Sequence, residues 1–238
     1  MIYNVKISNG DRQSVFEYIE LKRKEGKFTI VDIGGTTEGW SSPIIDAIID
    51  FKKPIKSKKE YIDEYLLIFN IDITDPDQWE DVLLYVEKNG KFDFSICTHT
   101  LEDIINPGFV SRQITKISKE GYIATPSKHS ELAIHEAYYV PKSEYNPETY
   151  VKYGHKGYMH HRWIFAINNN KLIGFPKIGY LDTVDFFDNI ASNEPSIGDL
   201  SFFWKKDIEF EYINNNYLGP TSANIVSYFN NLRREDFI

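Results

Sequence analysis

Disulfide chemistry is almost excluded by the composition of this chain, which has a single cysteine, Cys97, among 238 residues. One thiol cannot form an internal disulfide, so we expect a protein of a reducing compartment, and specifically a cytoplasmic one. The chain also lacks an apolar run long enough to cross a bilayer, and its first stretch, MIYNVKISNGDR, lacks the layout of a secretory signal. No membrane partner is expected.

Positive charge is also scarce, because 27 Lys and Arg residues stand against 35 Asp and Glu residues, a formal net charge of −8. A protein that binds nucleic acid over a large surface usually carries an excess of positive charge, so DNA and RNA are disfavoured as partners. The hydrophobic share of 42% and the charged share of 26% are typical of a soluble globular protein. None of these values indicates an oligomeric state.

Short apolar runs and helical patterns alternate over the first half of the chain. Strands are expected at residues 28–33, 44–51, 65–73, 92–97 and 122–125, and helices at 11–24, 77–88 and 107–118. This alternation predicts a parallel sheet covered by helices, in which the carboxyl ends of the strands meet at one edge. Open sheets of this kind bind their ligands at that edge.

The second half of the chain has a different pattern, with loops, aromatic residues and clustered histidines. A hairpin is expected around the Asn-rich turn at 168–170, then one long strand at 201–213 and a final helix at 222–235. The whole chain, 1–238, therefore predicts a single α/β domain, a Rossmann-like three-layer sandwich. Its mostly parallel sheet would carry an antiparallel C-terminal hairpin and an inserted lid.

The first predicted strand ends in VDIGGTTEGW, where Asp32 precedes Gly34 and Gly35. Two residues without a Cβ let the backbone turn sharply and let a ligand approach it closely. A phosphate loop would need Lys followed by Ser or Thr after the glycines, and the dinucleotide pattern needs a different glycine spacing. Neither fits, so the turn does not indicate a phosphate-binding loop.

Acidic residues also end the second and third predicted strands. Asp50, followed by Phe51, is placed to accept both hydroxyls of a ribose, one per oxygen. Asp72 is placed to accept the exocyclic amine of adenine while Ile73 covers the ring. Strand-end acids also serve simply as turn caps, and Asp72 stands just before a plausible helix start. In series with the glycine turn, they indicate an adenosine-containing ligand.

These segments resemble a known family. VDIGGTTEGW, IIDF, NIDITD and FDFSICTHTLEDI, the last followed by SKEGYIATPS, are similar to the successive motifs of class I S-adenosylmethionine-dependent methyltransferases of the small-molecule branch, over about residues 28–130. The resemblance implies S-adenosylmethionine as cofactor, a cofactor-binding half at about 28–126 and an acceptor and lid half at about 127–238. The cofactor residues that it implies are Asp32, Gly34, Gly35, Asp50, Phe51, Asp72, Ile73, Thr98 and His99.

The chain departs from the family pattern behind the first two glycines. Thr36, Thr37 and Glu38 stand where a third glycine is usual, and Pro43 falls where the middle of the following helix would be. Either the loop takes a different path or the affinity for the cofactor is reduced. A catalytically inactive binding module with the methyltransferase fold therefore stays open as the alternative to an enzyme.

Histidines are the expected catalytic residues, because methylation of a hydroxyl requires a base and imidazole titrates in the right range. His99 is the first choice, and His160 or His161 comes next. Neighbouring residues of a strand face opposite ways, so at most one of the tandem histidines is expected to face the site. Arg162 and Trp163 are the expected substrate contacts, with Trp163 or a Tyr stacking on a sugar ring, and the alternative is that this strand simply packs against the lid.

The expected reaction is methylation of a sugar, glycan or other small-molecule hydroxyl. No metal is expected. Glu131 and His135 are four residues apart, a spacing that places two ligands on one helical face, but a surface pair is the better interpretation of them.

Overall fold

The computed structural model describes residues 1–51, 66–133, 138–141, 150–153, 156–158, 160–177 and 197–213. The described elements are, in chain order, β1 (Ile2–Ser8), α1 (Arg12–Glu25), β2 (Ile30–Ile33), β3 (Ala47–Asp50), β4 (Leu67–Asn70), the 3-10 helix η1 (Pro76–Trp79), α2 (Glu80–Asn89), β5 (Phe92–Thr98), α3 (Pro107–Ile117), β6 (Ser118–Pro126), α4 (Lys128–Glu131), β7 (Tyr138–Pro141), β8 (Tyr150–Tyr153), β9 (Trp163–Asn168), β10 (Lys171–Pro176), β11 (Asp199–Lys205) and β12 (Glu209–Tyr212).

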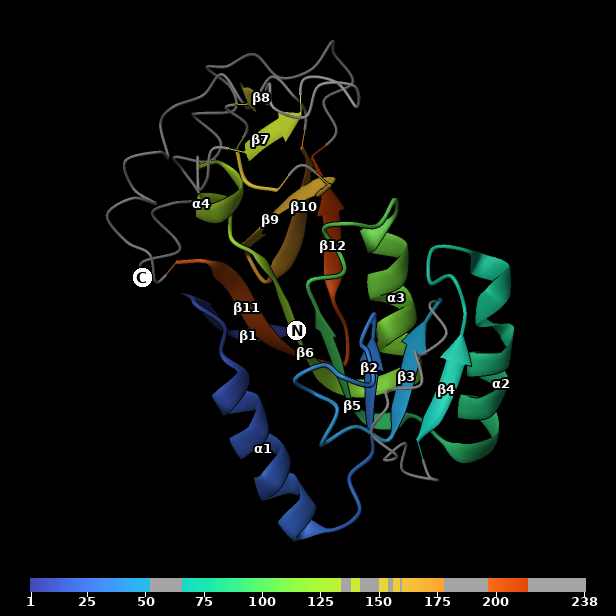
Figure 1. Ribbon diagram of the computed structural model, residues 1–238. Helices are drawn as coiled ribbons and strands as arrows, with labels where there is room; N and C mark the ends of the chain where they lie inside the picture. Colours follow the sequence, from blue (N-terminus) through green and yellow to red (C-terminus); the bar gives the residue numbers. More distant parts are fainter. Residues whose placement is uncertain are drawn as a thin grey trace.

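A seven-stranded sheet forms the centre of the molecule, in the order β1-β11-β6-β5-β2-β3-β4 (Figure 1). The five strands from β4 to β6 in this order pair in parallel, and β11 pairs antiparallel with both β6 and β1. The predicted α/β class with a mostly parallel sheet is confirmed. Since β11 runs against its neighbours, its first residue lies at the edge where the parallel strands end.

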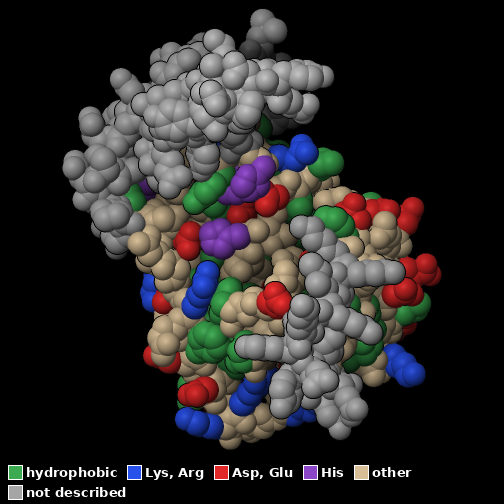
Figure 2. All heavy atoms as spheres, in the orientation of Figure 1, with side chains coloured by type: hydrophobic (Ala, Val, Ile, Leu, Met, Phe, Trp, Pro, Cys, Tyr) green, Lys and Arg blue, Asp and Glu red, His purple; other side chains and the backbone are tan. Residues whose placement is uncertain are grey.

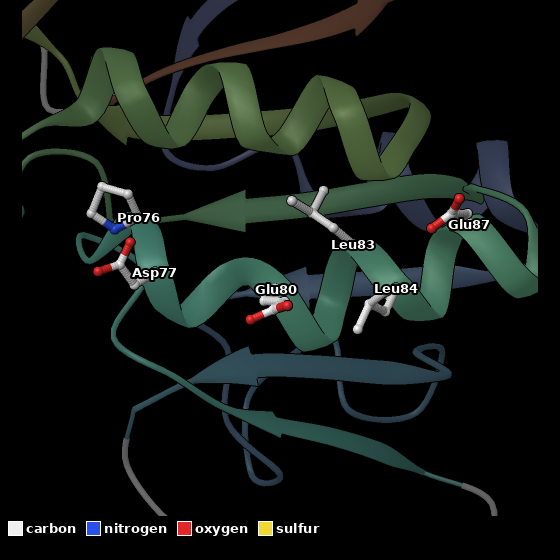
Figure 3. Close-up of a pocket in the computed structure, with 6 residues that line it drawn as sticks. All are labelled: Pro76, Asp77, Glu80, Leu83, Leu84 and Glu87. Atoms are coloured by element: carbon white, nitrogen blue, oxygen red, sulfur yellow. The ribbon is translucent and has the colours of Figure 1, made fainter.

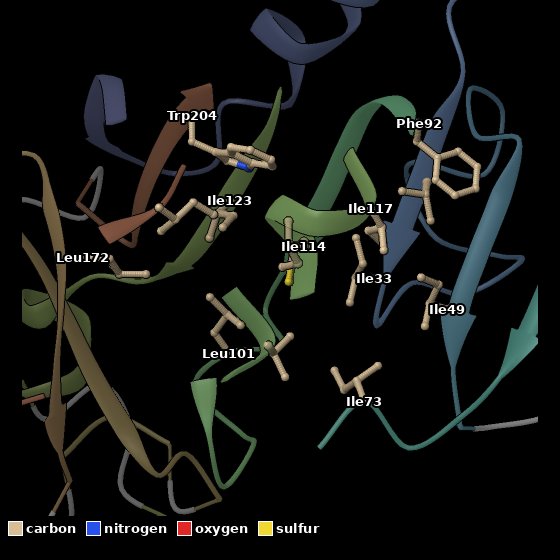
Figure 4. Packing of buried hydrophobic residues seen from close by; sticks show 14 of the residues in the cluster. Ile33, Ile49, Ile73, Phe92, Leu101, Ile114, Ile117, Ile123, Leu172 and Trp204 are labelled. Atoms are coloured by element: carbon tan, nitrogen blue, oxygen red, sulfur yellow. The ribbon is translucent and has the colours of Figure 1, made fainter. Parts of the chain in front are cut away.

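Helices cover the two faces of this sheet, as the alternation of buried side chains requires. Val15 and Ile19 of α1 pack with Phe94 on one face. On the other face, α2 and α3 pack over the sheet, and Ile114 belongs to the cluster that includes Ile33 (Figure 4). In Figure 1, α1 lies on one side of the strands, and α2 and α3 lie on the other. The three-layer arrangement therefore matches the sequence pattern.

No helix forms in the described segment between β2 and β3, residues 34–46. Consecutive turns occupy it, with Gly39 N donating to Thr36 O at 3.1 Å and Ser42 N donating to Gly39 O at 3.1 Å. Pro43 lacks an N–H, so a regular helix could not continue through this position without losing a hydrogen bond. The family pattern that the sequence resembles has a helix here, which Pro43 was expected to shorten, and the structure has turns in its place.

The hairpin predicted in the second half is confirmed. β9 and β10 pair antiparallel, and the turn residues Asn169 and Asn170 have φ angles of 50° and 61°. Asn tolerates this left-handed conformation, which a two-residue hairpin turn requires. The hairpin does not extend the main sheet, because β10 pairs in parallel with β12 to form a separate three-stranded sheet.

The long strand predicted at 201–213 is wrong, because two strands in different sheets occupy this segment. The extended conformation of β11 ends before Lys206, whose φ is 70°. Asp207 N then donates to Lys205 O at 2.9 Å, which forms a tight turn. β1 was not predicted at all, although it pairs with β11 over five register positions. The alternation of apolar and polar side chains along a strand does not show which neighbour in the sheet that strand pairs with.

Other predictions fall wholly or partly outside the described residues. The final helix expected at 222–235 lies there, and so does most of the expected lid, of which the structure describes α4, the pair of strands β7 and β8, and short connecting segments. The single-domain assignment stays a prediction. In the described part of the chain, none of the helices has the length and apolar character that a membrane crossing needs.

The close contact of β6 with its two neighbours gives a test of the sheet. Gly121 pairs with Ser95 on one side and with Trp204 on the other, and a Cβ added to it would overlap both. Gly121→Ala should lower the free energy of unfolding by about 1–3 kcal/mol, measured by urea denaturation. Gly39→Ala, in a looser turn, is the control and should change it by less than about 1 kcal/mol. Equal effects of the two substitutions would contradict this packing.

Candidate functional site

The glycine turn after β2 is held in place by residues that pack against it. Gly34 has a φ of 74°, its N–H donates to Ile49 O at 2.8 Å, and a Cβ there would overlap the Thr100 side chain. At Gly35, a Cβ would overlap the carboxyl group of Asp32. Both positions therefore need glycine for packing, and the open backbone that they leave lies at the carboxyl end of β2.

Asp32 is a buried acid next to this turn. Its carboxylate accepts a hydrogen bond from Ser41 Oγ, and no cationic side chain among the described residues forms an ion pair with it. Burial raises the pKa of Asp32 to about 7, the Ser41 hydrogen bond acts in the opposite direction, and the charge of Asp50 raises it further. A cation bound beside this carboxyl would remove the cost of ionising it.

Asp50 stands at the end of β3, one strand away from Asp32, as predicted. It lies on the strand that pairs with the strand of Asp32, and its charge raises the pKa of Asp32. Asp50 is half-buried, and its backbone oxygen accepts from Ile71 N at 3.2 Å. Phe51 follows with 62% of its surface exposed. The carboxyl ends of β2 and β3 therefore carry two acids and an exposed aromatic ring.

The third strand end is less open than the sequence suggested. Asp72 Oδ1 accepts hydrogen bonds from Thr74 N at 2.8 Å and from Thr74 Oγ1 at 2.7 Å. Ile73 is 6% exposed and belongs to the core cluster, near Leu101 in Figure 4. One Asp72 oxygen is thus engaged in a local turn, the alternative that the sequence left open. Adenine binding by this pair stays a prediction.

The fourth strand end places Thr98 and His99 at the same edge. Thr98 Oγ1 accepts from Trp40 Nε1 at 3.3 Å, which ties the segment after the glycine turn to β5. His99 has a φ of 50°, and its backbone N–H donates to Ala124 O at 2.9 Å. A positive φ is uncommon for a residue other than glycine, so the surrounding hydrogen bonds must hold this backbone in place.

Two carboxylates flank the imidazole of His99. Nε2 lies 3.6 Å from Asp199 Oδ1, and Nδ1 lies 3.4 Å from Glu102 Oε1. Asp199 and then Glu102 raise the pKa of His99 to about 10, although partial burial opposes the charge. His99 is therefore an imidazolium near neutral pH. In this state it donates hydrogen bonds and cannot accept the proton that the sequence analysis assigned to it.

A cavity of about 440 Å³ opens beside His99. Its lining comes from the ends of β6 and β11 and from the segment before β9, and it consists of Asn9, His99, Pro126, Ser130, Tyr158, His160, His161, Gly198 and Asp199. Figure 2 shows histidine side chains grouped with acidic ones on one face of the molecule. The structure thus brings together the three histidines that the sequence selected.

The expectation that only one tandem histidine faces the site is wrong. His160 and His161 both line the cavity, because residues 160–162 precede β9 and do not form a strand with alternating faces. Their rings lie 4.4 Å apart, centroid to centroid, at an interplanar angle of 74°. The prediction failed because it assumed strand geometry for residues 160–162, which form a turn and its continuation before β9.

Glu131 is a site residue whose role the sequence analysis missed. The surface pair expected for it is wrong, since it is 1% exposed. One carboxylate oxygen lies 2.5 Å from His161 Nδ1, and the other accepts from Lys177 Nζ at 2.7 Å. This buried carboxylate orients His161 so that its Nε2 faces the cavity. His135, its expected partner, lies outside the described residues.

Arg162 and Trp163 have other contacts than those predicted. The Arg162 side chain is exposed, and its backbone N–H donates to Glu102 O at 2.6 Å. The Trp163 indole donates to Ile104 O at 2.8 Å and packs 5.1 Å from the Tyr212 ring. Neither is among the described residues that line the cavity. Substrate contact by these two side chains stays a prediction.

A second hollow of about 440 Å³ lies along η1 and α2 (Figure 3). Its lining consists of Pro76, Asp77, Glu80, Leu83, Leu84 and Glu87. All six come from one continuous helical segment, with acidic and apolar side chains but no histidine. We assign no chemistry to it, because none of the polar residues at the strand ends lines it.

The raised pKa of Asp32 predicts an unusual pH dependence of stability. The folded state holds this proton up to a pKa of about 7, against an ordinary value of 3.8, so ionisation opposes folding. The contribution of Asp32 to the free energy of unfolding should fall as pH rises from 4 to 7, with a slope of at most about 1.4 kcal/mol per pH unit. Asp32→Asn should remove this decline in denaturation curves, and an identical pH profile would contradict it.

The carboxylates around His99 predict that its ring stays charged. Its raised pKa means that the stabilising interactions are complete below pH 6.5 and are lost as pH rises toward 10. Proton NMR should show the His99 ring signals titrating above pH 8, and Asp199→Asn should shift this titration downward by about one pH unit or more. Titration of His99 near pH 6.5 in the wild-type chain would rule out the charged state.

Comparison with known proteins gives no family assignment for this chain. No family model matches the chain, and no curated protein is similar to it. Among solved structures, it is similar to the N-terminal domain of EvdMO1 with SAH bound (TM-score 0.41, 12% identity, 84% of this chain and 82% of that chain) and to that domain in the presence of SAH and D-fucose (0.40, 11%, 82% and 84%). It is also similar to a cyclopropane-fatty-acyl-phospholipid synthase-like protein from Lactobacillus casei (0.33, 14%, 56% and 57%).

Proposed function

We propose that this chain is an S-adenosylmethionine-dependent methyltransferase that methylates a hydroxyl group of a sugar or another small molecule. The observation that carries the proposal is the pair of acids at the glycine turn. Asp32 is buried beside Gly35, Asp50 is close enough to raise the pKa of Asp32, and both stand at the carboxyl ends of adjacent parallel strands. Ligands of open α/β sheets bind at this edge.

The charge of this pair selects among adenosine ligands. A phosphate group would be repelled by two carboxylates and would find no lysine in the turn sequence GGTTEGW. S-adenosylmethionine instead carries a sulfonium and an ammonium group, which favour an acidic environment. A bound cation would return Asp32 to its ionised form, and Asp50 would accept the ribose hydroxyls.

Transfer itself is a displacement at the methyl carbon. The bond from sulfur to carbon breaks with its electron pair staying on sulfur, while the acceptor oxygen forms the new bond and loses its proton. The cavity beside His99 provides a place for the acceptor at the same edge of the sheet. Positioning the oxygen in line with the methyl group supplies a large part of the rate in such reactions.

The histidines of the cavity have two different tasks in this reaction, holding the acceptor oxygen and accepting its proton. Because Asp199 and Glu102 raise the pKa of His99, its ring acts as a hydrogen-bond donor that holds the acceptor oxygen. The proton is then left to the tandem pair, and His161 has its Nδ1 engaged by Glu131 and its Nε2 available. A carboxylate that orients an imidazole in this way is a common arrangement for a general base.

A hydroxyl-rich acceptor suits the lining of the cavity. Asn9, Ser130, Tyr158 and Asp199 add polar groups to the histidines, and a volume of about 440 Å³ is within the range of small-molecule sites. Polar groups at several points of a cavity recognise a ligand with several hydroxyls better than an apolar one. This supports a sugar as the acceptor class.

The alternative is a binding module that retains the fold without catalysis. The observation that favours it is the stretch 34–46, where turns stand in place of a helix and where packing alone accounts for both glycines. Without a helix, this loop lacks the helix N-terminus that would otherwise face the cofactor. Cofactor binding without methyl transfer would distinguish this module from an enzyme.

Calorimetric titration with S-adenosylmethionine tests the proposal. The wild-type chain should bind one equivalent, and Asp50→Ala should weaken binding by about 1–3 kcal/mol, the cost of leaving ligand hydroxyls unpaired. Asp81→Ala, which removes an exposed acid from α2, is the matched control and should leave the dissociation constant unchanged. Absence of binding to the wild-type chain, or equal binding by the Asp50 variant, would refute the cofactor site.

If the chain binds S-adenosylmethionine, a methyl-transfer assay distinguishes an active enzyme from an inactive binding module. Methyl-labelled cofactor should be incubated with mono- and oligosaccharides, and transfer should be measured as label in the acceptor. Label in any sugar supports the enzyme. Binding with no transfer to any hydroxyl compound tested would favour the inactive module.

A further inference from the structure

We propose that Asp103, His160 and His161 bind one divalent transition-metal cation in the wall of the acceptor cavity. The three side chains come from two segments that are far apart in sequence, the loop after β5 and the turn before β9. One ligand atom from each lies within 4.8 Å of the others. The sequence analysis expected no metal and did not select Asp103 as a site residue.

The distances between these atoms fit a shared ion. His160 Nε2 and His161 Nε2 each lie 3.8 Å from the same oxygen, Asp103 Oδ1. This is too long for a hydrogen bond. Two ligands bound to one zinc ion at tetrahedral angles are about 3.4 Å apart, so a movement of a few tenths of an ångström would bring both histidines to this distance from Asp103. The three ligand atoms lie within 4.8 Å of one another, so the remaining pair must close by at most about 1.4 Å.

The surroundings of His161 support the same conclusion. Histidines that bind metals usually donate the other ring nitrogen to a carboxylate, which fixes the ring and the tautomer. His161 has this partner, since its Nδ1 lies 2.5 Å from Glu131 Oε1. Lys177 Nζ lies 2.7 Å from the second oxygen of Glu131 and balances its buried charge. The remaining nitrogen of His161 is thereby directed toward Asp103 and the cavity.

The ligand types decide which ion is expected. Two imidazoles and one carboxylate suit zinc and similar first-row metals, whereas magnesium and calcium prefer oxygen ligands. The side chains of His160 and Asp103 are 69% and 42% exposed, so the site is open on the cavity side. Three protein ligands with an open position are typical of catalytic zinc sites rather than structural ones.

The position of this site has a consequence that rests on the proposed function. A hydroxyl that binds a divalent metal loses its proton more easily than a free one. His160 and His161 would then hold the ion in place of acting as the base, and the metal-bound hydroxyl, made more acidic by the ion, would give its proton to water. The ion-binding itself does not depend on methyl transfer, so the two proposals can fail separately.

Zinc binding to the full chain, stripped with a chelator, tests the site. In competition with a chromophoric chelator, the wild-type protein should bind one equivalent of Zn²⁺. His160→Ala and Asp103→Asn should each weaken binding at least 10-fold through loss of a ligand, and Glu131→Gln should weaken it 10- to 100-fold through loss of orientation. His160 is largely exposed, so its variant should fold even if substitutions near Glu131 do not.

Two controls define the result. His99→Gln, in the same cavity but outside the ligand set, and Asp81→Asn, on α2, should bind Zn²⁺ within twofold of wild type. Absence of stoichiometric binding to the wild-type chain, or equal binding by the His160 and Asp103 variants, would overturn the proposal. S-adenosylmethionine titration of the same samples reports on the cofactor site independently, so failure of one site is distinguishable from failure of the other.

Discussion

The carboxyl group of Asp32 imposes the constraint on which the candidate site depends. It is buried at the end of a central strand, and its hydrogen bond comes from Ser41. Burying an acid beside a second acid is unfavourable unless it stays protonated or a cation arrives. The Asp32 carboxyl group can occupy this position only because residue 35 is glycine, since a Cβ at residue 35 would overlap the carboxyl group. The turn, the buried acid and its neighbour are thus one unit, and its negative charge favours a bound cation over a phosphate group.

The direction of β11 accounts for the chemistry of the cavity. Because β11 runs antiparallel to β6, its first residue, Asp199, pairs with Pro126 at the edge where the parallel strands end. This places a carboxylate opposite His99, at the end of β5, and the ring is held between Asp199 and Glu102. The same antiparallel strand that completes the sheet therefore raises the pKa of a central histidine.

Local sequence patterns predicted the parts of the fold that depend on neighbours in the chain. Strand-end positions of Asp32, Asp50 and His99 followed from apolar runs that stop at polar residues, and the hairpin turn followed from consecutive asparagines. The break at Lys206 could not be predicted, because apolar and polar residues alternate on both sides of it and only sheet membership separates the two strands. The same limit hid β1, whose partner is almost two hundred positions away.

The role of Glu131 shows why part of the site was inaccessible to sequence reasoning. An acid in a polar stretch such as KHSE reads as a surface residue, yet all four of these residues are buried. Burial of Glu131 becomes tolerable only because His161 and Lys177 reach its two oxygens from segments thirty and forty-six positions away. A buried carboxylate with two such partners fixes the geometry of both, so His161 presents one nitrogen to the cavity in a defined direction. The orientation of His161 thus depends on a residue that no local pattern connects with it.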